Sequence, residues 1–272
     1  GAGKIGLTGA AIAERLLLAG YSVHGFDFSA ERARVLVHLG GAAMETPEAV
    51  AQVAPRIIVT AAEGYDVEEV LWGDRGVVQR THRPTHIIDT ATSDPDRVMR
   101  IADRVDRDRI EFIDATIAGT SELVRKGKSV LMVGGGGVGV TACTDLFEAI
   151  AKRWFHLGGP GTASRARLAL SLLVGLHRVA LAESLTFAER LGLDPNAFVE
   201  FLRASPAYSA AADSKAAKML SGDYTPQGRL RTYLSDVRLA LRFARRSGQG
   251  LPFAELQAWL LTDAVSNGDG DL

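Results

Sequence analysis

Residues 162–191 read TASRARLALSLLVGLHRVALAESLTFAERL. The sequence pattern before this stretch differs from the pattern after it. It contains no proline and one interior glycine, Gly175, and it carries apolar side chains around most of its circumference. Apolar character over this length predicts one long, largely buried helix. A small helical domain supplies little cover for such a helix, so we expect a second copy of the chain to cover part of it.

On the N-terminal side of this stretch, short β-branched segments alternate with amphipathic ones. The sequence predicts strands at residues 22–28, 56–62, 85–92, 110–117 and 129–135. It predicts helices at residues 29–40, 46–54, 94–105 and 144–153. Such alternation is typical of a mostly parallel sheet with helices on its faces. We therefore expect a nucleotide-binding type of α/β domain over residues 1–160.

On the C-terminal side, strand signals are absent and only helical patterns follow. Helices are predicted at residues 195–205, 209–220, 228–248 and 252–268. Together with the long helix they predict an all-α domain over residues 161–272. The expected fold is thus an α/β domain followed by a helical domain built on one long helix.

Composition narrows the class of function. The chain has 272 residues, with 31 lysine and arginine residues against 32 aspartate and glutamate residues. This balance argues against a nucleic-acid partner or a polybasic membrane patch. A single cysteine, Cys143, excludes an internal disulfide framework and a cysteine-cluster metal site, and no other metal-ligand spacing is present. We expect no metal, no signal peptide, no transmembrane span and a cytoplasmic location.

The first residues carry a glycine pattern typical of dinucleotide-binding loops. Gly1, Gly3 and Gly6 have the GxGxxG spacing, a helical segment follows, and the next predicted strand ends in Asp27. An acidic side chain at that distance binds the hydroxyl groups of the adenosine ribose and favours NAD, because it would repel the 2′-phosphate of NADP. The pattern predicts NAD as the cofactor, with NADP less favoured.

No complete strand pattern precedes this loop in the sequence, so we expect the first strand to be missing or defective. In one alternative, Gly6 and Gly9 are the second and third glycines and Lys4 stands where the first should be. In another, the first strand begins at residues 4–7 and residues are deleted before Gly9. The sequence leaves these alternatives open. A second glycine run, GGGGVG at residues 134–139, lacks an acid at the end of the next strand, so we interpret it as a turn.

Eight stretches, taken in order, resemble one family. They are AAIAERLLLAGYSVHGFD, VEEVLWGDRGVV, IIDTATSDPDRV, FIDATIAG, SVLMVGG, HLGGPGTASRARLALSLLVGLH, MLSGDYTP and YLSDVRLALRFA. The chain resembles the β-hydroxyacid dehydrogenases, which include 3-hydroxyisobutyrate dehydrogenases, and it resembles most their L-threonate dehydrogenase-like branch. The resemblance implies a Rossmann-like domain, a long interdomain helix, a 6-phosphogluconate dehydrogenase-like helical domain, a homodimer or dimer of dimers, and NAD(P)-linked oxidation of a small hydroxy acid.

The resemblance also implies the site residues. Thr92 would contact the nicotinamide ribose, and Ala118 and Gly119 would line the substrate site, where the family has a serine followed by glycine. The stretch that usually reads KDL is Ser235, Asp236 and Val237, so Asp236 would lie near the substrate while the family's lysine is absent.

Two positions on the long helix carry the chemistry in this resemblance. The family's lysine is Arg167 here, and the amide four residues later is Ser171. Arginine stays protonated, so it cannot act as a general base, but it can bind a carboxylate or stabilise an oxyanion. We expect an oxidoreductase that acts on a small carboxylate or a related carbonyl or imine. The alternative is an inactive homologue that forms a ligand- or partner-binding dimer.

Overall fold

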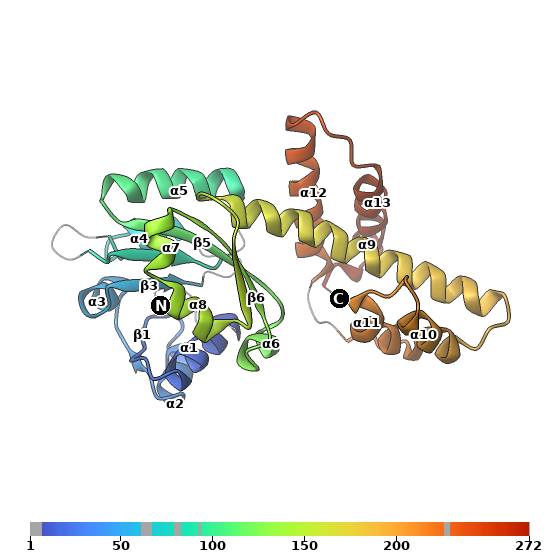
Figure 1. Ribbon diagram of the computed structural model, residues 1–272, viewed down its shortest axis with the longest axis horizontal. Helices are drawn as coiled ribbons and strands as arrows, with labels where there is room; N and C mark the ends of the chain where they lie inside the picture. Colours follow the sequence, from blue (N-terminus) through green and yellow to red (C-terminus); the bar gives the residue numbers. More distant parts are fainter. Residues whose placement is uncertain (1–6, 61–66, 79–82, 92–93, 226–228, 272) are drawn as a thin grey trace. The chain divides into compact units, whose positions relative to one another are not determined.

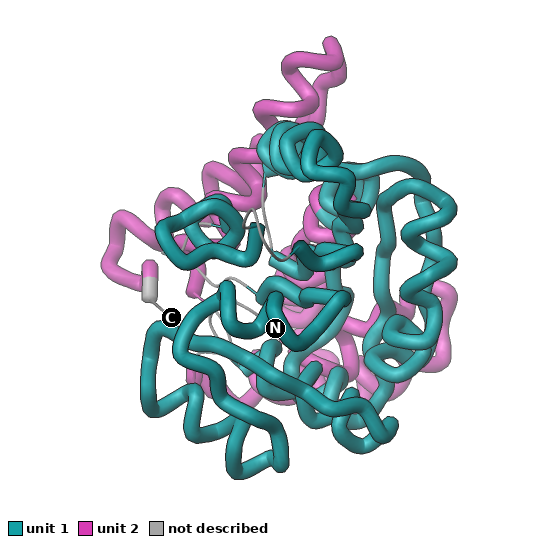
Figure 2. The backbone as a smooth tube through the Cα atoms, turned by 90° about the vertical axis from the view of Figure 1, so that its left-hand side faces the viewer, with its two compact units in different colours: residues 1–167 teal, residues 168–272 magenta. Residues whose placement is uncertain are grey.

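The computed structural model describes residues 7–60, 67–78, 83–91, 94–225 and 229–271 (Figure 1). The chain forms two compact units, Gly1–Arg167 and Leu168–Leu272, which Figure 2 distinguishes by colour. The boundary between the units falls inside the long helix α9, Thr162–Arg190. Each unit has its own core, so we describe them separately.

Unit 1 alternates strands and helices, as predicted. Its elements before α9 are α1 (Leu7–Leu18), β1 (His24–Gly25), α2 (Ala30–His38), β2 (Ala42–Ala43), α3 (Pro47–Val53), β3 (Arg56–Val59), α4 (Val67–Trp72), β4 (His86–Asp89), α5 (Pro95–Arg107), β5 (Glu111–Ala118), α6 (Ser121–Arg125), β6 (Val130–Gly135), α7 (Gly137–Thr141), α8 (Thr144–Ile150) and β7 (Arg153–His156). Polar side chains set several helix starts: Thr46 Oγ1 accepts from Ala49 N, and an Asp94 oxygen accepts from Asp96 N.

Two sheets lie in the described part of unit 1. Strands β1 and β2 pair in parallel, and a larger sheet has the order β3-β4-β5-β6-β7. Strands β3, β4 and β5 are parallel, β6 is antiparallel to β5, and β7 is parallel to β6. The prediction of a mostly parallel sheet is confirmed. The expectation that the first strand is missing or defective concerns residues before Leu7, the first residue of α1, and these lie outside the described residues.

Helices cover both faces of the larger sheet. On one face, α3, α4 and α5 bury an apolar cluster against β3, β4 and the start of β5, with Ile57, Ile87 and Phe112 as its strand residues. On the other face, α1 and α8 pack against alternate residues of the same strands, such as Ile58, Ile88 and Ile113. The alternation follows from the two-residue repeat of a strand, and burial on both faces explains the continuous apolar runs.

Several element boundaries differ from the predictions. The strand predicted at residues 22–28 is shorter in the structure: β1 covers only His24–Gly25, and Phe26 forms an isolated bridge. The helix predicted at 144–153 ends at Ile150, because Arg153 already pairs with Val130 of β6. Strand β2 and the short helices α4, α6 and α7 were not predicted, because elements of two to six residues carry too little periodicity.

Unit 2 is helical throughout its described part. After α9 come α10 (Pro195–Ala204), α11 (Ala210–Ser221), α12 (Leu230–Arg246), α13 (Pro252–Ser266) and a final 3₁₀ turn (Asp269–Asp271). Leu181 and Leu185 of α9 pack against α10 and α11. Nearer the start of α9, Leu172 packs against α12 and α13. The predicted all-helical domain is confirmed, and α9 is the element that both of its clusters share.

The prediction that α9 is largely buried is wrong for the single chain. Only 22% of the most apolar 18-residue stretch of α9 is buried, and Leu173 and Phe187 are 51% and 63% exposed. By length and composition alone, α9 could also cross a membrane, which the sequence analysis did not expect. Core helices of soluble proteins share this length and composition, so one such helix is weak evidence of a membrane span. An apolar circumference shows only that a helix needs cover, not that its own chain supplies it.

Candidate functional site

Asp27 lies two residues after β1, where the sequence predicted an acid that binds ribose. Its side chain is 5% exposed, and Oδ1 accepts a hydrogen bond of 2.8 Å from the backbone N–H of Ser29, the residue before α2. This bond fixes the carboxylate at the strand-to-helix turn. A carboxylate accepts hydrogen bonds from the two ribose hydroxyls but repels a phosphate, so the residue type fits the adenosine end of NAD.

A small hollow adjoins this strand in unit 1. It is lined mainly by apolar and small residues of α1, β1, α2 and β3, among them Gly9, Gly25 and Ile58. Gly9, Ala10 and Ala11 form the buried first turns of α1. Small residues at the start of this helix let backbone approach closely, as a pyrophosphate-binding turn requires. Gly1, Gly3, Gly6 and Thr92, the other predicted cofactor contacts, lie outside the described residues.

The second glycine run has a structural use. A β-carbon at Gly134 would lie 2.6 Å from Thr162 Oγ1 and 2.8 Å from the Gly159 carbonyl oxygen, and it would overlap Asp114 Oδ1. The N–H of Gly135 donates to Gly158 O at 2.9 Å. The run therefore lets β6 pack tightly against the start of α9, in line with its interpretation as a turn.

Asp114 connects the sheet to the first turn of α9. Its side chain is 1% exposed, Oδ1 accepts from Gly161 N, and Oδ2 accepts from Ser164 N, each at 3.0 Å. Two residues along β5, Thr116 Oγ1 donates to Ala163 O at 3.2 Å. Burial raises the pKa of Asp114, whereas the N–H donors of Ser164 and Gly161 lower it. This role could not be predicted from local sequence patterns, because the partners are 47 to 50 residues away.

Asp89 is the register neighbour of Asp114 on the adjacent parallel strand. It is fully buried, and Oδ1 accepts from Ala91 N at 2.9 Å. Burial, opposed by that bond and assisted by the nearby charge of Asp114, raises the pKa of Asp89 to about 7. Two buried carboxyl groups thus lie side by side on the sheet, next to the start of α9.

Three predicted substrate residues belong to unit 1. Ala118 is the last residue of β5, and Gly119 follows with φ +141°, a conformation that favours glycine. Arg167 is half-buried on α9, one turn beyond Ala163. Because Thr116 binds Ala163, the strand end at Ala118 and the helix turn at Arg167 extend from the same point of contact.

The other two, Ser171 and Asp236, belong to unit 2. Tyr233 of α12, which was not among the predicted site residues, contacts the first of them: its hydroxyl donates to Ser171 O at 3.4 Å and accepts from Gln257 Nε2 at 2.6 Å. Asp236 lies three residues after Tyr233 on α12 and contributes to raising the pKa of Tyr233, although burial is the main cause. A β-carbon at Gly175 would overlap the Tyr233 hydroxyl. The single glycine of α9 was therefore the feature of the sequence that could have indicated this close contact.

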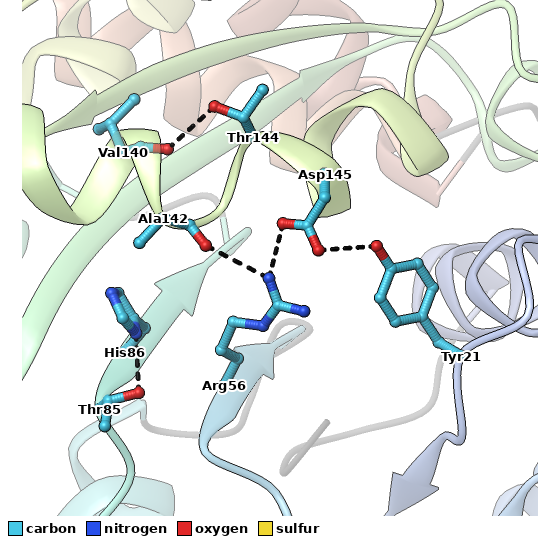
Figure 3. Close-up of polar contacts among 8 residues, drawn as sticks. All are labelled: Tyr21, Arg56, Thr85, His86, Val140, Ala142, Thr144 and Asp145. Carbon is cyan, nitrogen blue, oxygen red and sulfur yellow. Dashed lines mark hydrogen bonds and ion pairs between the residues drawn. The ribbon is translucent and has the colours of Figure 1, made fainter.

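A second polar cluster lies at the amino ends of β3 and β4 (Figure 3). An Arg56 Nη1 atom lies 2.6 Å from Asp145 Oδ1 and donates to Ala142 O at 3.3 Å. Tyr21 Oη donates to Asp145 Oδ2 at 2.7 Å. Burial lowers the pKa of His86 beside this cluster. The cluster is partly exposed and lies away from the carboxyl ends of the strands, where ligands bind in such sheets. We therefore interpret it as a structural contact that holds α8 against β3.

Metal chemistry has no support in the described part of the chain. Among residues 7–60, 67–78, 83–91, 94–225 and 229–271, no group of three or more histidine, cysteine, aspartate or glutamate side chains could hold a metal ion. Cys143 is buried and unpaired, and burial raises the pKa of its thiol to about 11. It is therefore a poor nucleophile at neutral pH.

Comparison with known proteins identifies the family. A sequence model described as the NAD binding domain of 6-phosphogluconate dehydrogenase matches residues 2–158, and one described as NAD-binding of NADP-dependent 3-hydroxyisobutyrate dehydrogenase matches residues 161–272. The first alone covers more than half of the chain.

Relatives match over almost the whole length. L-threonate dehydrogenase of Cupriavidus necator is 26% identical over 270 residues, which are 98% of this chain and 91% of that protein. 2-Hydroxy-3-oxopropionate reductase of Escherichia coli is 26% identical over 268 residues, with coverage of 98% and 91%. The crystal structure of 3-hydroxyisobutyrate dehydrogenase from Salmonella typhimurium has a TM-score of 0.86 at 22% identity and covers 99% of this chain and 95% of that one.

These matches do not favour an inactive homologue. The chain belongs to the β-hydroxyacid dehydrogenase family, and it is an NAD(P)-dependent oxidoreductase of that type.

Proposed function

We propose that the chain interconverts a small hydroxy acid and its carbonyl form with NAD as the preferred cofactor. The observation that carries the cofactor preference is Asp27, a buried carboxylate held at the end of β1 by Ser29 N. A 2′-phosphate beside this carboxylate would suffer like-charge repulsion in a site with little water. Gly1, Gly3 and Gly6 would bind the pyrophosphate, and Thr92 the nicotinamide ribose.

The substrate residues follow from the family pattern. Ala118, Gly119, Arg167, Ser171 and Asp236 would line the substrate site. Arg167 would bind the substrate carboxylate or a developing oxyanion, because its guanidinium group forms two parallel hydrogen bonds and keeps its charge. The bound nicotinamide supplies or accepts the hydride. Since Arg167 cannot take the alcohol proton, that proton would leave through another group or through water.

The substrate class rests on the relatives. L-threonate and 2-hydroxy-3-oxopropionate, named in two of them, are small hydroxy acids that carry a carboxylate. A cation at position 167 suits a carboxylate substrate. A related carbonyl or imine is the second candidate, because hydride addition to an iminium needs no proton donor at oxygen, which fits the loss of the family's lysine.

We also propose a cytoplasmic homodimer, or a dimer of dimers, without nucleic-acid or membrane partners. Unit 2 exposes large apolar side chains on several of its helices. Among them are Leu170, Leu173, Val174 and Phe187 on α9, and Phe253, Leu256, Trp259 and Leu260 on α13. Exposed apolar surface of this kind marks an interface, and a second copy is the commonest partner. A domain division near residue 160, just before α9 begins at Thr162, is also part of our proposal.

Fluorescence titration with NADH and NADPH tests the proposal, on protein that retains residues 1–6 and whose molar mass is measured by light scattering. We expect saturable NADH binding, weaker NADPH binding and a dimer or tetramer. Asp27→Asn should weaken NADH binding about tenfold and narrow the preference over NADPH, since a lost charge-assisted pair of hydrogen bonds costs about 1.5–3 kcal/mol. Glu31→Gln, an exposed change on α2, is the matched control. No saturable binding of either cofactor would overturn the proposal.

A further inference from the structure

The start of α9 is fixed by one buried side chain. Gly161 N and Ser164 N are backbone donors three residues apart at the beginning of the helix, and each binds a different oxygen of Asp114. The first N–H groups of a helix have no partner inside the helix, and they lie at the positive end of its dipole. Asp114 therefore acts as a helix cap supplied from a strand, and both of its oxygens are committed to it.

The bonds from Asp114 fix more than the height of the helix above the sheet. A contact through one atom would leave α9 able to rotate, whereas two oxygens on two N–H groups restrict rotation as well. Thr116 adds a third bond, from its hydroxyl to Ala163 O at 3.2 Å. Asp114 and Thr116 are two residues apart, so their side chains point to the same face of the sheet. Both are 1% exposed, and water therefore does not compete for these bonds.

Neighbouring residues leave room for the carboxylate. At Gly134, across from Asp114 in the antiparallel pair β5–β6, any β-carbon would overlap Asp114 Oδ1. A glycine is therefore required for α9 to approach the strand this closely. The positive φ of Gly161, +82°, turns the chain into the helix at the point where its N–H meets Asp114.

The same strand and helix then continue to the substrate residues. On β5, Ala118 lies two residues after Thr116, an advance of about 7 Å. On α9, Arg167 lies four residues after Ala163, an advance of about 6 Å. Both advances start from the bond between Thr116 and Ala163. A shift of the helix start would therefore displace Arg167 relative to Ala118 by a similar amount.

We propose that Asp114 is a positioning residue for the reaction, which holds the first turn of α9 so that Arg167 has its working position beside the end of β5. The inference rests on the proposed function, because it assumes that Arg167 contacts the substrate. Misplacement of a binding group by about 1 Å can cost about 10²-fold in rate, so a small shift is enough to matter.

Asp114→Asn is the decisive variant, because it keeps the shape while one of the two acceptors becomes an N–H donor. We expect kcat with L-threonate or 3-hydroxyisobutyrate to fall at least tenfold, while the NADH dissociation constant stays within about twofold. Amide hydrogen exchange at Gly161 and Ser164 should accelerate at least tenfold. Exchange at the amides of α5, which packs in the apolar cluster on the sheet, should not change. Asp145→Asn, which alters an exposed carboxyl group of the same unit, is the control and should leave all three measurements unchanged.

Thr116→Val provides a second variant in case Asp114→Asn does not fold. It removes only the bond to Ala163 and should lower kcat less, about threefold to tenfold. The proposal is wrong if Asp114→Asn keeps both kcat and amide protection, or if its loss of rate equals its loss of NADH-binding sites, which would indicate simple unfolding. If the wild-type protein turns over none of the hydroxy acids, the proposed function fails, and the exchange measurement still decides whether Asp114 holds the helix.

Discussion

Two sets of polar contacts hold helices to the five-stranded sheet, and they differ in burial and in charge balance. Asp114 binds the start of α9 through backbone N–H groups and is 1% exposed. Arg56 and Asp145 join β3 to α8 as an ion pair whose side chains are 26% and 48% exposed. In the first contact a buried carboxyl group accepts from backbone N–H groups at the start of one helix, and in the second two charged side chains pair beside water.

The difference indicates which contact can determine geometry. A buried carboxylate must keep its hydrogen bonds, because losing them leaves an unsatisfied group in a low dielectric. An exposed ion pair can break and be replaced by water at little cost, and its side chains lose entropy when they form it. Ala118 and Arg167, which we propose as substrate residues, follow the Asp114 contact along β5 and α9, whereas the Arg56 cluster lies at the amino ends of the strands (Figure 3).

The largest expected effect concerns Asp89, the buried neighbour of Asp114. Its pKa rises from 3.8 to about 7 on folding, so folding takes up a proton between these pH values. Stability from this group is fully present below pH 3.8 and is lost as the pH rises to about 7, by up to about 4 kcal/mol. Asp89→Asn keeps the acceptor for Ala91 N but removes the titration. Relative to wild type, the variant should gain stability by a similar amount between pH 4 and pH 8.

Urea unfolding at several pH values measures this gain. Asp103→Asn, at an exposed position on α5, is the control and should change the pH dependence little. A difference between Asp89→Asn and wild type that does not vary with pH would contradict the assignment of a neutral, buried Asp89 below pH 7. It would also weaken the conclusion that burial distinguishes the carboxyl groups beside α9 from the exposed pair of Arg56 and Asp145.

The next effect tests how tightly α9 must approach the sheet. Gly134→Ala should destabilise the protein by about 1–3 kcal/mol, because the new β-carbon meets Asp114, Thr162 and Gly159. Gly137→Ala is a matched control in the same glycine run, because nothing lies within 4 Å of its β-carbon. Denaturant unfolding should place the control within about 0.5 kcal/mol of wild type. Equal effects of the two changes would show that the glycines act through backbone freedom rather than through space beside Asp114.

Local patterns in the sequence were enough to predict much of the fold. Strand and helix periodicity located the main elements, because each repeat is set by neighbouring residues. The antiparallel pairing of β5 with β6 could not be predicted this way, since both strands are buried on both faces and read as similar apolar runs. The burial of α9 was overestimated because an apolar circumference does not indicate which chain covers it.

The same distinction between local patterns and contacts distant in sequence applies to the candidate site. The place of Asp27 after a strand was predictable, because its spacing from the glycine loop and the strand pattern before it are both local, and its role toward the ribose stays a prediction. Asp114 and Tyr233 were not, because their partners are distant in sequence: Gly161 and Ser164 for the first, Ser171 and Gln257 for the second. Residues that hold other residues in place are visible only once the chain is folded.

The smallest expected effect concerns the exposed side of the comparison. A double-mutant cycle of Arg56→Gln and Asp145→Asn should give a coupling energy of about 0.2–1 kcal/mol, because both side chains are partly exposed and screened by solvent. The Arg56 guanidinium lowers the pKa of Asp145, chiefly by hydrogen bonding, so the coupling should decline as the pH falls and Asp145 is protonated. It should also decline in 1 M salt. A coupling above about 2 kcal/mol that resists salt would show that this cluster is as rigid as the Asp114 contact, and the contrast between the two would then no longer hold.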